Sequence, residues 1–203
     1  MRRLALLFAG LLVAGCTAVT TGPPARPSAS LPAAAGPTSA SAPSDLQAMR
    51  RAAGIADCPP SGGAPVAGGL PDVTLTCLGG GSTVRLAGLR GPMVVNLWAQ
   101  WCYPCRAESA HLAAFASTST RVKMLGVDFA DPQPDRAIEF AQLTAMTYPH
   151  VTDPTGETRV GLKISGIPAS FLIDAKGVIV ARHVGAFGSL ESVQSWVKDG
   201  LGS

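Results

Sequence analysis

Two cysteines separated by two residues are the side chains best suited to chemistry in this chain. They lie in Trp101-Cys102-Tyr103-Pro104-Cys105, shortly after an apolar run. A helix that begins at this motif would present unpaired N–H groups and the positive end of its dipole to the first sulfur. Both effects lower the pKa of the Cys102 thiol. The motif therefore predicts an exposed nucleophile at Cys102 and a shielded resolving thiol at Cys105.

A zinc site is the main alternative for cysteines at this spacing. Zinc needs two further ligands. The chain has no second pair of this kind, and its three histidines are scattered at positions 111, 150 and 183. We therefore expect a redox pair that uses no metal and no cofactor.

The elements around the motif alternate in type. The apolar run 93–98 predicts a strand buried on both faces, and a helix follows over 103–116. A strand over 122–129, a helix over 131–145, a short strand at 150–152 and a short helix over 155–162 come next. Strands over 169–174 and 178–183 flank a hairpin turn, and 190–201 predicts the last helix. The order β-α-β and then β-β-α predicts an α/β fold of three layers, with a central mixed sheet and helices on both faces.

The first fifteen residues have the pattern of a secretory signal. Arg2 and Arg3 precede an apolar run over 4–13 that is too short for an ordinary membrane span. The sequence Leu-Val-Ala-Gly-Cys at 12–16 resembles the lipobox of bacterial lipoproteins. That resemblance implies cleavage before Cys16 and a lipid on its thiol, which would hold the protein on the outer face of the bacterial cytoplasmic membrane. An uncut anchor and a soluble secreted protein are the alternatives.

Residues 16–44 then predict a tether, because Ala, Pro, Ser, Thr and Gly dominate them. As a random coil the tether would reach roughly 30 Å. Residues 45–69 predict an extension that consists of a short helix and a loop. Its helix opens at Ser44, which has capping-box spacing to Gln47. The main domain is expected over 70–203, and it starts with a β-hairpin, 73–77 and 83–86, on the edge of the sheet.

Charge and cysteine number narrow the possible partners. The net charge is +3, and Arg2 and Arg3 carry two of these charges, so the rest carries about +1 (3 − 2). Nucleic acid is not expected as a partner.

Lipidation of Cys16 would account for the odd number of cysteines. Cys58 and Cys77 predict a structural disulfide, worth about 3 kcal/mol, in an oxidising compartment. Two free thiols or a second redox pair are the alternatives.

Two segments carry a resemblance to a known family. Val-Val-Asn-Leu-Trp-Ala-Gln-Trp-Cys-Tyr-Pro-Cys at 94–105 resembles the active-site segment of thioredoxin-like proteins, and Gly-Ile-Pro-Ala-Ser-Phe-Leu-Ile-Asp at 166–174 resembles their second motif. Pro-Asp-Val-Thr-Leu at 71–75 is similar to the TlpA/ResA-like membrane-anchored thiol–disulfide oxidoreductases. The resemblance covers 70–203 and implies a thioredoxin-like fold.

The resemblance also implies roles for single residues. Pro168 takes the position of the family's cis-proline, and the Ile167 backbone would pair with substrate. Asn96 replaces the buried Asp of thioredoxins proper. Glu108 matches a helix glutamate of the subgroup, one turn after Cys105, and burial would raise its pKa so that it could exchange a proton with Cys105. The alternative is an ordinary first-turn Glu. Ser109-Ala110 departs from the subgroup, which usually has a nearby Pro.

The remaining family positions concern docking. Trp98 is expected in the core and Trp101 on an apolar docking surface, where Tyr103 and Pro104 would also meet substrate. Gly185 resembles a glycine beside the active site, although a plain turn glycine is the alternative.

The expected function follows from this resemblance. It implies an extracytoplasmic reductase that acts on protein disulfides, keeps apocytochrome c cysteines reduced for cytochrome c maturation, and receives electrons from a CcdA-type membrane donor. A disulfide-forming oxidase is the alternative. A copper chaperone is disfavoured by the two-residue spacing, and a peroxidase by the paired cysteines.

Overall fold

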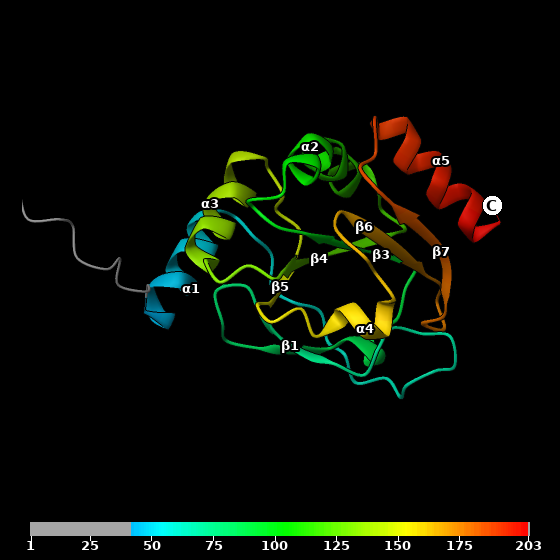
Figure 1. Ribbon diagram of the computed structural model, residues 1–203, viewed down its shortest axis with the longest axis horizontal. Coiled ribbons are helices and arrows are strands. Elements are labelled where there is room, and N and C mark those ends of the chain that lie inside the picture. Colours follow the sequence, from blue (N-terminus) through cyan, green and yellow to red (C-terminus); the bar gives the residue numbers. More distant parts are fainter. Residues whose placement is uncertain (1–41, 203) are drawn as a thin grey trace, which may run out of the picture. The chain divides into compact units, whose positions relative to one another are not determined.

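The computed structural model describes residues 42–202 (Figure 1). The predicted signal, Cys16 and most of the predicted tether lie outside these residues. The strands are β1 (Thr74–Cys77), β2 (Thr83–Arg85), β3 (Met93–Trp98), β4 (Lys123–Phe129), β5 (His150–Asp153), β6 (Ala169–Ile173) and β7 (Ile179–Val184). The helices are α1 (Pro43–Ala52), α2 (Tyr103–Thr118), α3 (Pro134–Leu143), α4 (Thr158–Leu162) and α5 (Leu190–Leu201), with a 3-10 turn η1 (Leu86–Gly88).

The strands form a mixed sheet in the order β2-β1-β5-β4-β3-β6-β7. β3, β4 and β5 run parallel, whereas β6 pairs antiparallel with β3 and β7 pairs antiparallel with β6. The hairpin β1–β2 joins the sheet antiparallel to β5. The predicted thioredoxin-like α/β fold and the hairpin on the edge of the sheet are therefore confirmed.

Each face of the sheet covers its own apolar core. Val94 and Trp98 of β3 belong to the core under α2, α3 and α5, whereas Val95 and Leu97 belong to the core on the other face, which includes Leu162 of α4. The alternation follows from the two-residue period of a strand. Figure 1 shows α2 and α4 on opposite sides of the sheet. Asn96 lies on the α2 side of β3, between Val94 and Trp98, and there it meets the candidate site.

The predicted starts of the helices were less accurate than the predicted bounds of the strands. α1 begins at Pro43 after Ala42, without a side-chain cap, so the predicted capping box of Ser44 is wrong. Proline suits the first helical turn because that position needs no N–H donor. α3 begins three residues later than predicted, because Asp131 accepts a hydrogen bond from Gln133 N–H and holds the chain in a turn. The Asp153 carboxylate likewise caps the start of α4 at Glu157 and Thr158.

Candidate active site

Cys102 and Cys105 form a disulfide at the N-terminus of α2, with an S–S distance of 2.02 Å. Cys102 is the N-cap residue of this helix, and its Sγ accepts a hydrogen bond of 3.2 Å from the Cys105 N–H. Pro104 lies in the first turn, as predicted. When the bond is reduced, the free N–H groups of this turn would face the Cys102 sulfur, and they favour a thiolate there.

Both sulfurs are buried in this oxidised state. Cys102 is 4 % exposed and Cys105 is 2 % exposed, so the prediction of an exposed Cys102 is wrong for the disulfide form. In this form both side chains belong to the apolar core under α2. The exposed side chains of the motif are Trp101 and Tyr103, at 53 % and 83 %. They provide the apolar surface through which a partner could approach the sulfurs.

The Ile167–Pro168 peptide bond is cis, as predicted. Ile167 packs against the apolar core that contains both sulfurs. Among the described residues its N–H and C=O make no hydrogen bond to another backbone group, whereas the next carbonyl, that of Pro168, accepts one of 3.0 Å from Gly185 N–H. Gly185 has a φ of +97°, and a side chain there would enter open space. An extended partner could therefore pair with Ile167 beside a site that Gly185 leaves open.

Glu108 lies one turn after Cys105 and is buried, which was the condition set for a raised pKa, and both of its carboxylate oxygens have donors. Asn96 Nδ2 donates to Oε1 at 2.9 Å, and the Phe187 N–H donates to Oε2 at 3.0 Å. Ser170 Oγ accepts the second hydrogen bond of Asn96 Nδ2, at 3.0 Å. Burial raises the pKa of Glu108 to about 7, because loss of water outweighs the two hydrogen bonds that lower it.

This network was only partly visible in the sequence. Asn96 was identified as a departure from thioredoxins proper and Glu108 as a match to the ResA-like subgroup, but their contact was not predicted. Ser170 and the Phe187 N–H were missed, since they lie 74 residues from Asn96 and 79 residues from Glu108. The one available signal was the polar Ser170 inside the apolar run 169–173.

Trp98 is buried, as predicted, and it packs beside His150 at the start of β5. Trp98 Nε1 lies 3.2 Å from His150 Nδ1, and His150 Nε2 lies 3.1 Å from the Met146 carbonyl oxygen. The indole can only donate, so Nδ1 accepts and Nε2 carries the proton. Burial lowers the pKa of His150 to about 4, which keeps the ring neutral.

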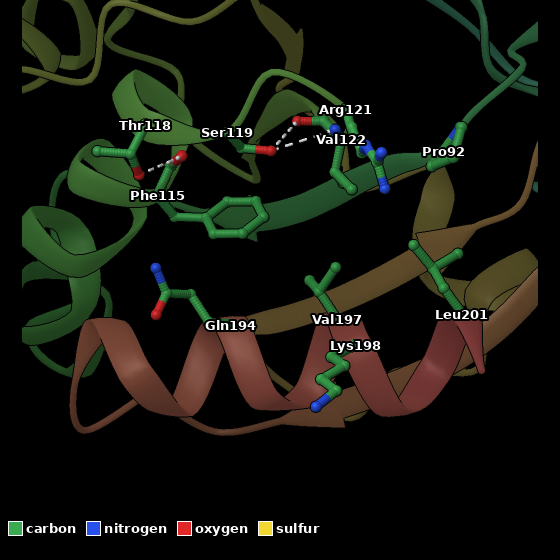
Figure 2. Close-up of a pocket in the computed structure, with 10 residues that line it drawn as sticks. All are labelled: Pro92, Phe115, Thr118, Ser119, Arg121, Val122, Gln194, Val197, Lys198 and Leu201. Carbon is green, nitrogen blue, oxygen red and sulfur yellow. Dashed lines mark hydrogen bonds between the residues drawn. The ribbon is translucent and has the colours of Figure 1, made fainter. Parts of the chain in front are cut away.

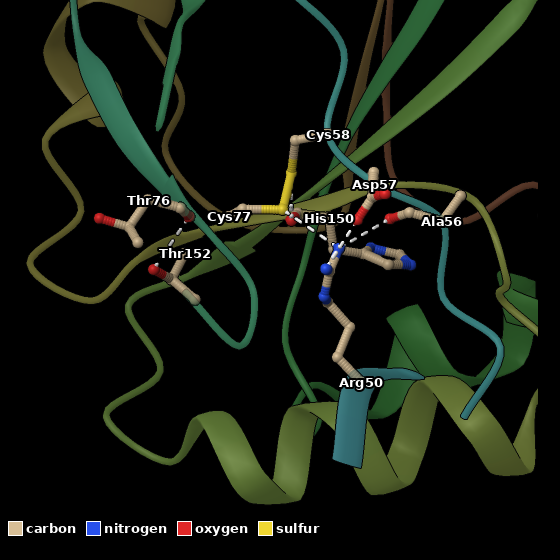
Figure 3. Close-up of a disulfide and its surroundings, with 8 residues drawn as sticks. All are labelled: Arg50, Ala56, Asp57, Cys58, Thr76, Cys77, His150 and Thr152. Carbon is tan, nitrogen blue, oxygen red and sulfur yellow. Dashed lines mark hydrogen bonds and ion pairs between the residues drawn. A yellow bond between two sulfur atoms is a disulfide. The ribbon is translucent and has the colours of Figure 1, made fainter. Parts of the chain in front are cut away.

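The predicted bond between Cys58 and Cys77 is confirmed, with an S–S distance of 2.06 Å (Figure 3). It joins the segment after α1 to the end of β1. Among residues 42–202, no three His, Cys, Asp or Glu side chains converge on a possible metal position. Within the same range, none of the helices is long and apolar enough to cross a membrane.

A cavity of about 570 Å³ lies between the C-terminal end of α2 and α5 (Figure 2). Phe115 and Val197 line its apolar walls, and Arg121 and Lys198 also contribute to its lining. The disulfide lies at the opposite end of α2, and a helix of 16 residues is about 24 Å long. This cavity is therefore separate from the sulfur site.

Known proteins resemble this chain over the same region. A relative named thiol:disulfide interchange protein DsbE, from Pseudomonas fluorescens biotype C, is 35 % identical over 119 residues, which are 57 % of this chain and 64 % of that protein. A DsbE of Vibrio cholerae is 38 % identical over 97 residues, which are 46 % of this chain and 50 % of that protein. The chain thus matches between half and two thirds of the length of these relatives.

Solved structures agree with the fold. The StoA structure from Bacillus subtilis is 25 % identical, with a TM-score of 0.52, and the match covers 62 % of this chain and 98 % of that one. A secreted disulfide oxidoreductase of Mycobacterium tuberculosis is 22 % identical, with a TM-score of 0.56 over 63 % of this chain and 96 % of that one. The family model for AhpC/TSA matches residues 66–182, which include both cysteines of the motif and the cis-proline. The chain belongs to the AhpC/TSA family.

Proposed function

We propose that this protein is a thiol–disulfide oxidoreductase that acts on protein thiols and disulfides through Cys102 and Cys105. The observation that supports this function is the disulfide at the start of α2, one turn before a buried carboxyl group with a pKa of about 7. The relatives named above as thiol:disulfide interchange proteins support the same reaction.

In the reducing direction the Cys102 thiolate attacks one sulfur of a substrate disulfide. The substrate bond breaks, its second sulfur leaves as a thiolate, and a mixed disulfide joins Cys102 to the substrate. Cys105 then attacks Cys102 Sγ and releases the second substrate thiol. The substrate gains two electrons, and the Cys102–Cys105 disulfide is restored. Trp101, Tyr103, Pro104 and the Ile167 backbone would bind the substrate chain during these steps.

Cys105 must lose a proton before it can attack. Glu108 follows it by one helical turn, and a base with a pKa near the working pH accepts and returns a proton most efficiently. Pro168 would hold the Ile167 backbone toward the substrate.

A finer proposal concerns the direction of electron flow, the partner proteins and the location of the protein. The chain would serve as a reductase in cytochrome c maturation, keep the cysteines of apocytochrome c reduced, and be reduced again by a CcdA-type membrane protein. A lipid on Cys16 would hold it on the outer face of the cytoplasmic membrane. The similarity of residues 71–75 and 94–105 to the TlpA/ResA-like subgroup supports this proposal.

The test combines a trap with a reduction potential. We expect Cys102→Ser to abolish reduction of a disulfide-bonded peptide, and Cys105→Ser to accumulate a mixed disulfide with it on Cys102. Ser109→Ala, on the same helix, serves as the control and should react normally. A potential of the Cys102–Cys105 couple near that of thioredoxin, about −270 mV, supports a reductase. A potential near that of DsbA, about −120 mV, would instead indicate the oxidase. Unchanged turnover in Cys102→Ser would refute the function itself.

A further inference from the structure

The second disulfide, Cys58–Cys77, has two sulfurs in different surroundings. Cys77 is buried at 1 % exposure at the end of β1, whereas Cys58 is half-buried in the segment after α1. An attacking thiolate must reach the sulfur that it attacks. Because residue Cys58 is more exposed than residue Cys77, Cys58 is the more accessible partner for attack, and Cys77 is the partner that would leave.

A buried arginine lies against the leaving sulfur. Arg50 of α1 places Nη1 3.8 Å from Cys77 Sγ, and Figure 3 shows the guanidinium between this sulfur, Ala56 and Asp57. Nη1 also lies 3.3 Å from the Ala56 carbonyl oxygen, and Nη2 lies 2.7 Å from Asp57 Oδ1. The Asp57 side chain is 91 % exposed, so water screens its charge and it offsets the buried cation only in part.

The other sulfur faces an oxygen instead of a cation. Cys58 Sγ lies 3.2 Å from the His150 carbonyl oxygen, and a sulfur in a disulfide has no hydrogen to donate to it. The His150 ring is neutral and supplies no positive charge nearby. A guanidinium stabilises a thiolate and a carbonyl oxygen destabilises one, so the surroundings favour the negative charge on Cys77. Accessibility and electrostatics thus both favour attack on Cys58 and departure of Cys77 as the thiolate.

We propose that Cys58–Cys77 is a second thiol–disulfide exchange centre, whose co-reactant is a dithiol and whose leaving thiolate is stabilised by Arg50. One thiolate of the dithiol attacks Cys58 Sγ. The Cys58–Cys77 bond breaks, and its electron pair goes to Cys77, which leaves as a thiolate beside Arg50. The second thiolate of the dithiol then attacks the mixed disulfide and releases Cys58. The dithiol becomes a disulfide, and its two electrons and two protons reduce Cys58 and Cys77.

This centre does not depend on Cys102 or Cys105, so it can be tested in the full chain with both replaced by serine. The variant is incubated with dithiothreitol at pH 7, and alkylation with mass spectrometry gives the rate and the equilibrium of reduction. We expect Arg50→Met to lower both by about tenfold, which corresponds to about 30 mV for a two-electron couple. Arg51→Met is the matched control, because Arg51 is the next residue of α1 and is exposed. It should change either value by less than about twofold.

A second measurement keeps Arg50 in place and does not depend on how Arg50→Met folds. A brief reaction with a small amount of glutathione should leave the adduct on Cys58, and peptide mapping separates this adduct from one on Cys77 or Cys16. Equal rates for Arg50→Met and Arg51→Met, an adduct on Cys77, or cleavage only after unfolding in urea would each overturn the proposal. None of these outcomes bears on the Cys102–Cys105 reaction, because that pair is absent from the tested chain.

Discussion

Glu108 is a buried carboxyl group whose pKa depends on its neighbours. It lies one turn after Cys105, and burial raises its pKa to about 7. The donors that hold its two oxygens could not be predicted, because they come from β3 and from the loop before α5. Their approach depends on the pairing of Asn96 with Ser170 across β3 and β6, which local sequence patterns do not specify.

The raised pKa of Glu108 predicts a pH-dependent stability. The folded state binds the Glu108 proton more tightly than the unfolded state, in which the pKa of this side chain is near 4.5. The contribution of Glu108 protonation to the stability of the fold is therefore complete below pH 4.5. It is lost as pH rises to about 7. We expect the free energy of unfolding of the wild type to fall by about 3 kcal/mol across this range, relative to Glu108→Gln. Urea unfolding at pH 4.5, 6 and 8 measures the difference.

The glutamine variant should retain the fold. Its side-chain oxygen can accept from the Phe187 N–H, and Asn96 can rotate its amide so that Oδ1, which has no partner among the described residues, accepts from the new amide. Glu139→Gln, on the exposed face of α3, is the control and should follow the wild type. If the free energy of unfolding had the same pH dependence in Glu108→Gln as in the wild type, that result would contradict the raised pKa of Glu108.

The elements were predicted better in their centres than at their ends. Apolar runs and alternation placed β3, β4 and β6 within about a residue of their observed bounds, because burial itself produces these patterns. The starts of α3 and α4 were wrong, because Asp131 and Asp153 bind backbone N–H groups that would otherwise have begun those helices. Such competition between a cap and a helix depends on local geometry more than on composition.

The packing of β4 against β3 and β5 depends on a glycine. A Cβ at Gly126 would overlap His150 Nδ1 and would lie 2.7 Å from Trp98 Nε1. We expect Gly126→Ala to lower the free energy of unfolding by about 3 kcal/mol, because neither buried ring has room to move. Gly166→Ala is the control, since nothing lies within 4 Å of the added carbon. Denaturant titration of both variants checks this, and equal midpoints would show that the rings yield.

At the scale of the whole chain, the sequence predicted the layers of the fold but not every neighbour within it. The hairpin β1–β2 was expected at an edge, yet only the structure shows that it extends the sheet through β5. The pairing of β1 with β5 brings Cys77 to the start of β5, where Cys58 and Arg50 contact it. A pairing made by residues far apart in the chain could not be read from local periodicity.

Attachment to the membrane is the property of the whole molecule that now needs a test, because Cys16 lies outside the described residues. Each CH₂ group of an acyl chain that enters the bilayer contributes about 0.8 kcal/mol, so a lipid on Cys16 would favour attachment of the mature chain to the membrane. We expect the wild type in the membrane fraction, released by detergent but not by salt, with an N-terminus at Cys16 that carries added lipid mass. Cys16→Ser should remove the lipid mass, whereas Thr17→Ala should leave it in place. A wild-type chain that begins after residue 16 and lacks the added mass would refute the tether, and the site would then act in a freely diffusing protein.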